Sequence, residues 1–261
     1  MLLIAMEETE ITVKIPLSVK KALESADIDV NVAVSNAINE ILQRSSIKEH
    51  YTEVILQNKE INAITAEDIP PGNFLYIPDL SLEQYEAIVD ETGWEYLDGI
   101  LIHHSPESNI HNAIFNLINH RAMSTLDPAS IILRTSHVAL NIYQDKPEPD
   151  LMAFSKDDFR RAKRADGSES EIIESAPLLV IEIISKSSSK NDEIKKQKYL
   201  SKGIKEYWRI YCHDDPLKVM VCWLKKGIYE ETEYTAGEIR SRILPDFAIT
   251  FEELSNPDIS R

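Results

Sequence analysis

The chain has 261 residues and a formal net charge of −16, with 43% hydrophobic and 28% charged residues. This composition predicts a globular protein with one large domain, or one ordinary domain with a small extra module. The acidic total argues against broad, non-specific nucleic-acid binding, so any phosphate-bearing partner needs a local basic surface. No apolar run reaches membrane-spanning length. Cys212 and Cys222 lack a zinc-binding spacing, and we expect two buried thiols in a cytoplasmic protein.

The N-terminal segment has the pattern of one strand and two helices. Residues 10–15 alternate polar and apolar side chains, which predicts a half-buried strand. Pro16 suits the first turn of a helix that runs to about residue 25. Residues 32–44 place apolar side chains on one face of a second helix. So short a unit cannot enclose a core alone, and it therefore needs a partner copy or the rest of the chain.

This order resembles the ribbon-helix-helix family, in which two paired strands enter the DNA major groove. The resemblance implies a module over residues 1–47 that makes the protein a homodimer, with Thr12 and Lys14 facing the DNA bases. Dimerisation without DNA contact is the alternative, because Glu10 lies on the same face of the ribbon. Residues 48–78 have weak periodicity and are predicted to form a linker.

The main domain is expected over residues 79–261. Ser81 and Gln84 are spaced as a capping box, which indicates the start of a helix. Residues 94–103 are predicted to form a hairpin whose turn lies at Asp98-Gly99. Further along, the charged stretch from residue 157 to residue 174 is expected to be loop or irregular helix, and its basic side chains to form a solvated face.

A helix and two strands are predicted next in the chain. The helix covers residues 110–123 and carries His111 near its start. Such a histidine, taken alone, is more often structural than a metal ligand. The strands cover residues 130–141 and 150–154, and Asp150 is the first residue of the second strand.

Residues 177–185 form a nearly unbroken apolar run, which predicts a strand buried on both faces. Glu182 lies within this run, and a buried carboxylate must be balanced by a cation, a strong donor or a proton. A lysine-rich helix over residues 191–202 and a strand over residues 206–211 follow. The residues alone leave two interpretations of Glu182 open: a structural glutamate–lysine pair, or part of a site for chemistry on phosphates.

The order of these elements is helix, three strands, helix, strand. It matches the αβββαβ core of restriction-endonuclease-like nucleases, the PD-(D/E)XK superfamily, which implies an α/β fold with a mixed central sheet. Within that superfamily the chain resembles the Uma family. The matching segments, in the family's order, are Trp94–Gly99, Ser105–Pro106, His111, Pro149–Asp150, Val180–Ser185, Lys195–Tyr199, Gly203–Trp208 and Leu244–Phe247.

The resemblance implies a Mg²⁺-dependent DNA endonuclease, with Mn²⁺ as a substitute. Asp150 and Glu182 would hold the metal, because Mg²⁺ prefers carboxylate oxygens, and Glu95 and His111 would complete the site. The superfamily's usual lysine, two residues after the second acid, is replaced by Ile184. The family resemblance moves this lysine into the following helix and selects Lys195 to assist the water or the phosphate. Lys196 and Lys198 remain the alternatives.

Two other functions are compatible with the sequence. The chain could be a DNA-binding or protein-binding regulator whose nuclease fold is inactive, or a purely structural interaction protein. Retention of Asp150, Glu182 and a helix lysine disfavours the purely structural alternative.

Overall fold

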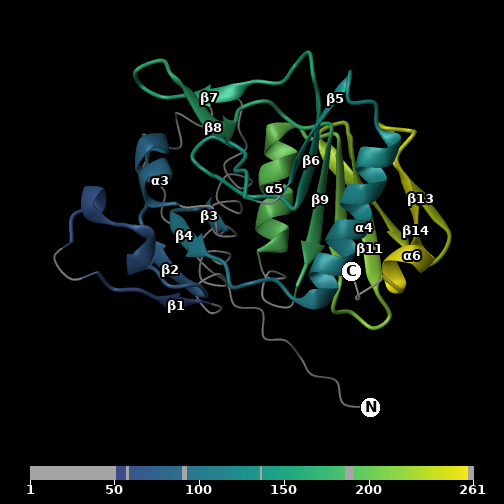
Figure 1. Cartoon of the computed structure of the whole chain (residues 1–261), viewed down its shortest axis with the longest axis horizontal. Coiled ribbons are helices and arrows are strands. Elements are labelled where there is room, and N and C mark those ends of the chain that lie inside the picture. The colour runs from purple at the N-terminus through teal and green to yellow at the C-terminus, as the bar shows by residue number, and fades with distance from the viewer. Residues whose placement is uncertain (1–50, 57–58, 90–92, 136, 186–190, 258–261) are drawn as a thin grey trace, which may run out of the picture. The chain divides into compact units, whose positions relative to one another are not determined.

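A sheet of six strands forms the centre of the fold, in the order β12-β11-β10-β9-β6-β5 (Figure 1). The computed structural model describes residues 51–56, 59–89, 93–135, 137–185 and 191–257. The predicted module over residues 1–47, with Thr12 and Lys14, lies outside the described residues. The strands of the central sheet are β5 (Ile131–Thr135), β6 (Leu151–Ser155), β9 (Leu179–Ile184), β10 (Glu206–Tyr211), β11 (Lys218–Lys225) and β12 (Ile228–Tyr234).

Strand β9 lies inside the sheet and all six of its residues are buried, as the apolar run predicted. It pairs in parallel with β10 and antiparallel with β6, so the sheet is mixed. Side chains alternate between the two faces of a strand. Ile181 and Ile183 pack in the same core cluster as Ile114 of helix α4 (Asn109–Thr125). Val180 packs in the core cluster of Tyr199, which belongs to helix α5 (Asp192–Lys202).

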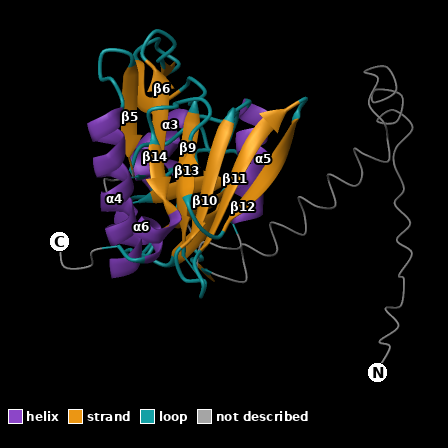
Figure 2. Ribbon diagram, turned by 90° about the vertical axis from the view of Figure 1, so that its right-hand side faces the viewer, coloured by secondary structure: helices purple, strands orange, loops and turns teal. Residues whose placement is uncertain are grey.

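The two helices therefore cover opposite faces of the sheet, as Figure 2 shows. Helix α5 ends where the sequence predicted, because Gly203 adopts the left-handed conformation (φ 76°) that glycine tolerates best. The parallel connection from β9 through α5 to β10 brings the helix back over the even-numbered face of β9. Glu182 is an even-numbered residue of this strand, and its side chain therefore faces α5.

A second sheet has the order β1-β2-β4-β3, with β1 (Thr52–Glu53), β2 (Asn73–Tyr76), β3 (Trp94–Leu97) and β4 (Ile100–His103). The predicted hairpin is confirmed as β3 and β4, and its turn has positive φ at both Asp98 and Gly99. Helix α3 (Leu82–Ile88) begins with the predicted capping box of Ser81 and Gln84.

The prediction of a linker over residues 48–78 is wrong for the part that the structure describes. Strand β2 pairs along its length with β4, and β1 pairs with β2. Two short 3₁₀ helices, η1 (Ile61–Ala63) and η2 (Ala66–Asp68), connect the two strands. Ile69, Phe74 and Ile77 are buried, so this stretch contributes to the core and belongs to the domain.

The charged stretch after β6 also differs from the expectation. It forms an antiparallel hairpin of β7 (Arg161–Lys163) and β8 (Glu169–Ile173). Ser170 is buried between exposed Glu169 and Glu171, and Ile172 is buried next, which is the alternation of a half-buried strand. Strand β5, which comes before β6 in the chain, covers Ile131–Thr135 and is shorter than the predicted 130–141.

The remainder of the domain follows the main sheet. Strands β11 and β12 form an antiparallel hairpin, and the chain continues through β13 (Glu238–Arg240), β14 (Ala248–Thr250) and α6 (Phe251–Ser255). Cys212 and Cys222 are free, buried thiols. Among the described residues, no helix has the length and apolar character needed to cross a membrane.

Candidate active site

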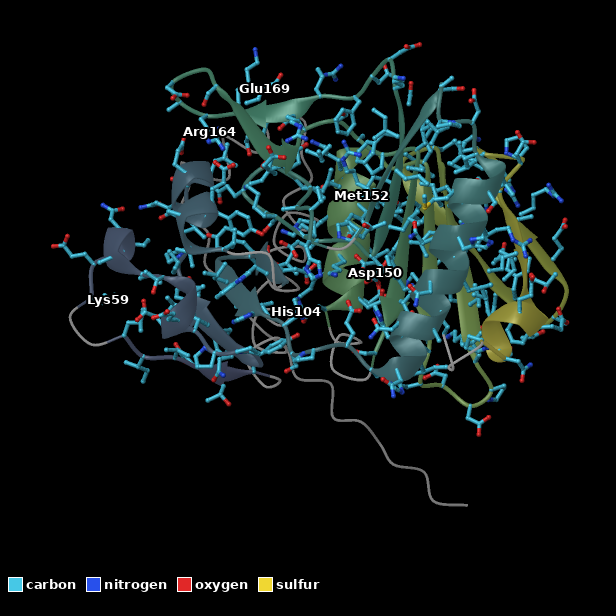
Figure 3. The ribbon with its side chains drawn as sticks, in the orientation of Figure 1. Lys59, His104, Asp150, Met152, Arg164 and Glu169 are labelled. Carbon is cyan, nitrogen blue, oxygen red and sulfur yellow. The ribbon has the colours of Figure 1, made fainter. Side chains whose placement is uncertain are left out.

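One cavity of about 350 Å³ is lined by all five residues that the sequence nominated for catalysis or metal binding. They come from strand β3, helix α4, the start of β6, strand β9 and helix α5. Figure 3 labels two residues of this cavity, His104 and Asp150. The five nominated residues are Glu95, His111, Asp150, Glu182 and Lys195.

Asp150 and Glu182 lie next to each other because β6 and β9 are hydrogen-bonded neighbours. Leu151 pairs with Ile181, which places the preceding aspartate beside the glutamate that follows. The backbone N–H of Ile183 donates to Asp150 Oδ2 at 2.6 Å and fixes that carboxylate. Both side chains are nearly buried, at 11% and 7% exposed for Asp150 and Glu182. Two acids thus meet at one end of adjacent strands.

Lys195 is the helix lysine that reaches these acids. Its Nζ lies 2.6 Å from Glu95 Oε1 and 3.0 Å from Glu182 Oε2. Tyr199, one helical turn later on the same face, donates its hydroxyl to Glu182 Oε1. The other two candidate lysines pair elsewhere on the molecule: Lys196 with Glu193 and Glu231, and Lys198 with Asp98 and Asp145.

His111 contacts the other side of Asp150. Ser108 is the N-cap of helix α4, and its side chain accepts the N–H of His111, so the histidine lies in the first turn and lines the cavity. Its Nε2 lies 3.2 Å from Asp150 Oδ1 and its Nδ1 lies 3.0 Å from Glu107 Oε2. Burial alone would lower the pKa of His111, but hydrogen bonds and attraction from Asp150 and Glu107 outweigh it and raise the pKa to about 10.

Two residues that the sequence analysis did not nominate support Glu95. His104 Nε2 lies 2.8 Å from Glu95 Oε2, and the backbone N–H of Glu148 donates to Glu95 Oε1 at 2.9 Å. The ring of Tyr51, from the wrongly predicted linker, also lines the cavity. A usable signal existed for Glu148, since an acid between two prolines stands two residues before Asp150. No local pattern marks Tyr51.

The electrostatics of the cavity are dominated by acids. Burial and the charge of Glu95 raise the pKa of Glu148 to about 8. Burial also raises the pKa of Glu182, to about 8. Lys195 lowers this pKa, but the negative charges of Asp150 and Glu95 raise it again. Burial opposes ionisation of Glu95 too, but its shorter contact with Lys195 and its contact with His104 lower its pKa. The raised pKa values of Glu148 and Glu182 indicate that the acids of the cavity are not fully balanced by the cations that face them.

A divalent cation fits this donor set. Five carboxyl groups line the cavity, whereas Lys195 is the only lysine or arginine among the described residues that line it. Carboxylate oxygens from neighbouring strands are ligands that Mg²⁺ accepts, and Asp150 with Glu182 offers them. A second grouping is Glu107, His111 and Asp150, whose ligand atoms all lie within 4.8 Å of one another. Its imidazole nitrogen suits Zn²⁺ better than Mg²⁺.

Comparison with known proteins identifies a structure with a similar fold and a matching family. The crystal structure of a putative nuclease belonging to DUF820 from Anabaena variabilis ATCC 29413 is similar, with a TM-score of 0.55 and 20% sequence identity. The match covers 67% of this chain and 96% of that one. No protein with a curated description matches the sequence. The family model described as Uma2, putative restriction endonuclease, matches residues 82–252, and the chain therefore belongs to the Uma2 family.

Proposed function

We propose that the protein is a Mg²⁺-dependent endonuclease that hydrolyses DNA phosphodiester bonds, with Mn²⁺ as a substitute. The observation that carries the proposal is the meeting of Asp150, Glu182 and Lys195 in one cavity, from two neighbouring strands and the covering helix. Membership of a family of putative restriction endonucleases supports it. The nuclease-like fold supports it as well.

Asp150 and Glu182 would hold the metal. A bound divalent cation supplies charge neutralisation on the phosphate and lowers the pKa of a nearby water. The backbone N–H of Ile183 keeps Asp150 in place, and the Tyr199 hydroxyl does the same for Glu182. Neither contact adds charge to the site. These neutral donors therefore preorganise the carboxylates for a cation without competing with it.

Lys195 would act as a donor rather than as a base. Burial disfavours its charged form, but Glu182 and Glu95 outweigh burial and raise the pKa of Lys195 above its usual range. The ammonium group is therefore protonated throughout the neutral range, and its N–H groups can donate hydrogen bonds that hold a phosphate oxygen or position the attacking water. Glu95 holds Nζ at 2.6 Å, which fixes the lysine at the edge of the acid pair.

A plasmid nicking assay tests this function. Supercoiled DNA should be converted to open-circular or linear forms in Mg²⁺ or Mn²⁺, and chelator should abolish the conversion. Asp150→Asn should lose activity and metal affinity together, because it removes charge without changing shape. Asp157→Asn is the matched control, since Asp157 is exposed and lies outside the cavity. Failure of the wild-type protein to nick DNA with either metal contradicts the proposal.

A regulator with an inactive nuclease fold is the second candidate. The observation that favours it is that Lys195 forms ion pairs with both Glu95 and Glu182. These two carboxylates neutralise the positive charge of the lysine. DNA binding in a gel-shift assay with chelator, combined with no cleavage in metal, would identify this function. We also propose, from the sequence pattern alone, that residues 1–47 make the protein a homodimer in either case.

A further inference from the structure

A second cavity of about 490 Å³ lies beside the candidate active site. Its walls come from helix α3, strand β5, residues 137–139 and the β7–β8 hairpin. His137 and Glu148 line both cavities, so the two spaces share a wall. We call the second space the arginine cavity, after Arg134, Arg161 and Arg164, which line it.

The three arginines differ in how they are bound. Arg164, labelled in Figure 3, donates to both carboxylate oxygens of Glu86, at 2.7 and 2.9 Å, and is thus fixed as part of the wall. Arg161 pairs with Glu171, whose side chain is 86% exposed, and such pairs contribute little. Arg134 has no carboxylate partner within the described residues. Its guanidinium lies 5.1 Å from the ring centre of Phe159, and Nη1 donates to the carbonyl of Leu133.

Arg134 therefore keeps donors available for a ligand. Three arginines face two carboxylates in this cavity, apart from the shared Glu148, whereas the neighbouring site has an excess of acids. In a chain with a net charge of −16, a cavity with surplus arginine is unusual and favours an anion. Arginine is well suited to phosphate, because its planar fork matches two phosphate oxygens.

Apart from His137, the rest of the wall is mostly apolar or aromatic. It is formed by Tyr85, Val89, Val138, Ala139 and Ile172. A volume of about 490 Å³ falls within the range of small-ligand pockets, about 300–1,000 Å³. A DNA duplex cannot enter such a space, because its major groove alone is about 12 Å wide. One unpaired nucleotide can, with its base and sugar on the apolar wall and its phosphate toward arginine.

We propose that the arginine cavity binds an unpaired nucleotide of the DNA strand beside the phosphate that is cleaved, with Arg134 contacting a phosphate of that nucleotide. This inference rests on the proposed nuclease function and adds a substrate class to it. The substrate strand is single-stranded, or its duplex is opened at the site. The shared wall of His137 and Glu148 sets the distance from this nucleotide to the cleaved bond.

The test uses the full-length protein in chelator, where no cleavage occurs. Fluorescence anisotropy measures its affinity for a single-stranded DNA dodecamer and for a hairpin duplex of the same strand. We expect tighter binding of the single strand, and a loss of about tenfold or more in Arg134→Ala, which removes a charge-assisted contact. Val138→Phe, which fills the cavity without a change of charge, should give a similar loss. Neither variant should change duplex binding more than twofold.

Arg160→Ala is the matched control, because Arg160 is exposed, carries the same charge and does not line the cavity. Thermal melting confirms that each variant is folded. The inference is overturned if neither probe binds, if Arg134→Ala and Val138→Phe leave single-strand affinity unchanged, or if Arg160→Ala weakens binding as much as Arg134→Ala. A correct binding pattern without nicking in metal rejects the nuclease function and keeps the cavity assignment. If the wild-type protein nicks DNA and Arg134→Ala leaves the nicking unchanged, the nuclease function is kept and the cavity assignment is rejected.

Discussion

Glu182→Gln separates a metal ligand from a structural ion-pair partner. Burial raises the pKa of Glu182 from the usual 4.5 to about 8 in the metal-free protein. At about 1.4 kcal/mol for each pKa unit, ionising this carboxyl in the folded state costs on the order of 5 kcal/mol. Glutamine avoids this cost, but its amide brings donors that need acceptors, and one left without a partner costs about 1–3 kcal/mol. We therefore expect the variant to be more stable at pH 9 by on the order of 3 kcal/mol.

The pH dependence gives the sign of the effect. Between pH 4.5 and about 8 the unfolded chain has released the proton of Glu182 while the folded chain retains it. The stability of the wild-type protein therefore falls as pH rises through this window, and this contribution is absent from Glu182→Gln. The advantage of glutamine should be near zero or negative at pH 4.5. It should then grow with pH and become constant above about pH 8.

Urea unfolding in chelator at pH 5, 7 and 9, followed by tryptophan fluorescence, measures the difference. Mg²⁺ should stabilise the wild-type protein, since a ligand that binds only the folded state shifts the equilibrium, and should not stabilise the variant. Glu206→Gln is the control for the metal effect. Glu206 is a buried glutamate on β10 held by neutral donors from Trp208 and Ser241, so this variant should keep the Mg²⁺ response. If Glu182→Gln is less stable by the same amount at every pH, Glu182 is a structural partner of Lys195.

Three further outcomes are expected. Glu107→Gln should lower Zn²⁺ affinity in calorimetry more than Mg²⁺ affinity, because the grouping of Glu107 with His111 and Asp150 includes an imidazole. Equal losses would reject a role for this group in metal selection. His111→Gln should lower the free energy of unfolding at pH 6 by on the order of a few kcal/mol, because the pKa of His111 is raised to about 10 in the folded protein. The stability gained from this shift is complete below pH 6.5 and is lost as pH rises through 10. A loss of stability that is the same at pH 6 and pH 10 contradicts this. Deletion of residues 1–47 should reduce the mass found by light scattering and leave the domain folded, and an unchanged mass refutes dimerisation through that segment.

The sequence predicted the central sheet well because its elements carry strong local signals. The apolar run of β9, the glycine that ends α5 and the Asp98-Gly99 turn each specify structure within a few residues. The nominated site residues could be named because the family resemblance gives their order along the chain. Their meeting in one cavity follows from strand pairing, with Leu151 opposite Ile181.

The missed features depend on contacts between distant parts of the chain. Strand β1 has only two residues and both are exposed, so no periodicity marks it, and its place is set by pairing with β2. In the β7–β8 hairpin, charged side chains mask the alternation that buries Ser170 and Ile172. Tyr51 precedes strand β1 and His104 follows strand β4, and both line the candidate site. At such positions no hydrophobic periodicity predicts which way a side chain points.

Lys195→Ala tests whether the helix lysine serves the reaction or only attracts DNA. Its Nζ lies within 3.0 Å of Glu182 and 2.6 Å of Glu95, so its removal takes a positive charge away from the proposed metal ligands. Metal affinity should stay constant or increase, while the cleavage rate falls on the order of a hundredfold or more, the scale of losing one preorganised hydrogen-bond donor to the charge of the transition state.

Lys196→Ala and Lys198→Ala remove the same charge from the same helix, but these lysines pair with Glu231 and with Asp98 outside the cavity. Their cleavage rates should stay within a few-fold of wild type at low salt. Added salt should weaken DNA binding by all variants alike, because it screens the general attraction of the helix for phosphate. If all three substitutions reduce the rate equally and salt reproduces the loss in the wild-type protein, α5 is only a phosphate-attracting surface. If the loss is confined to Lys195→Ala and persists at saturating DNA, the lysine acts on the reacting phosphate or its water.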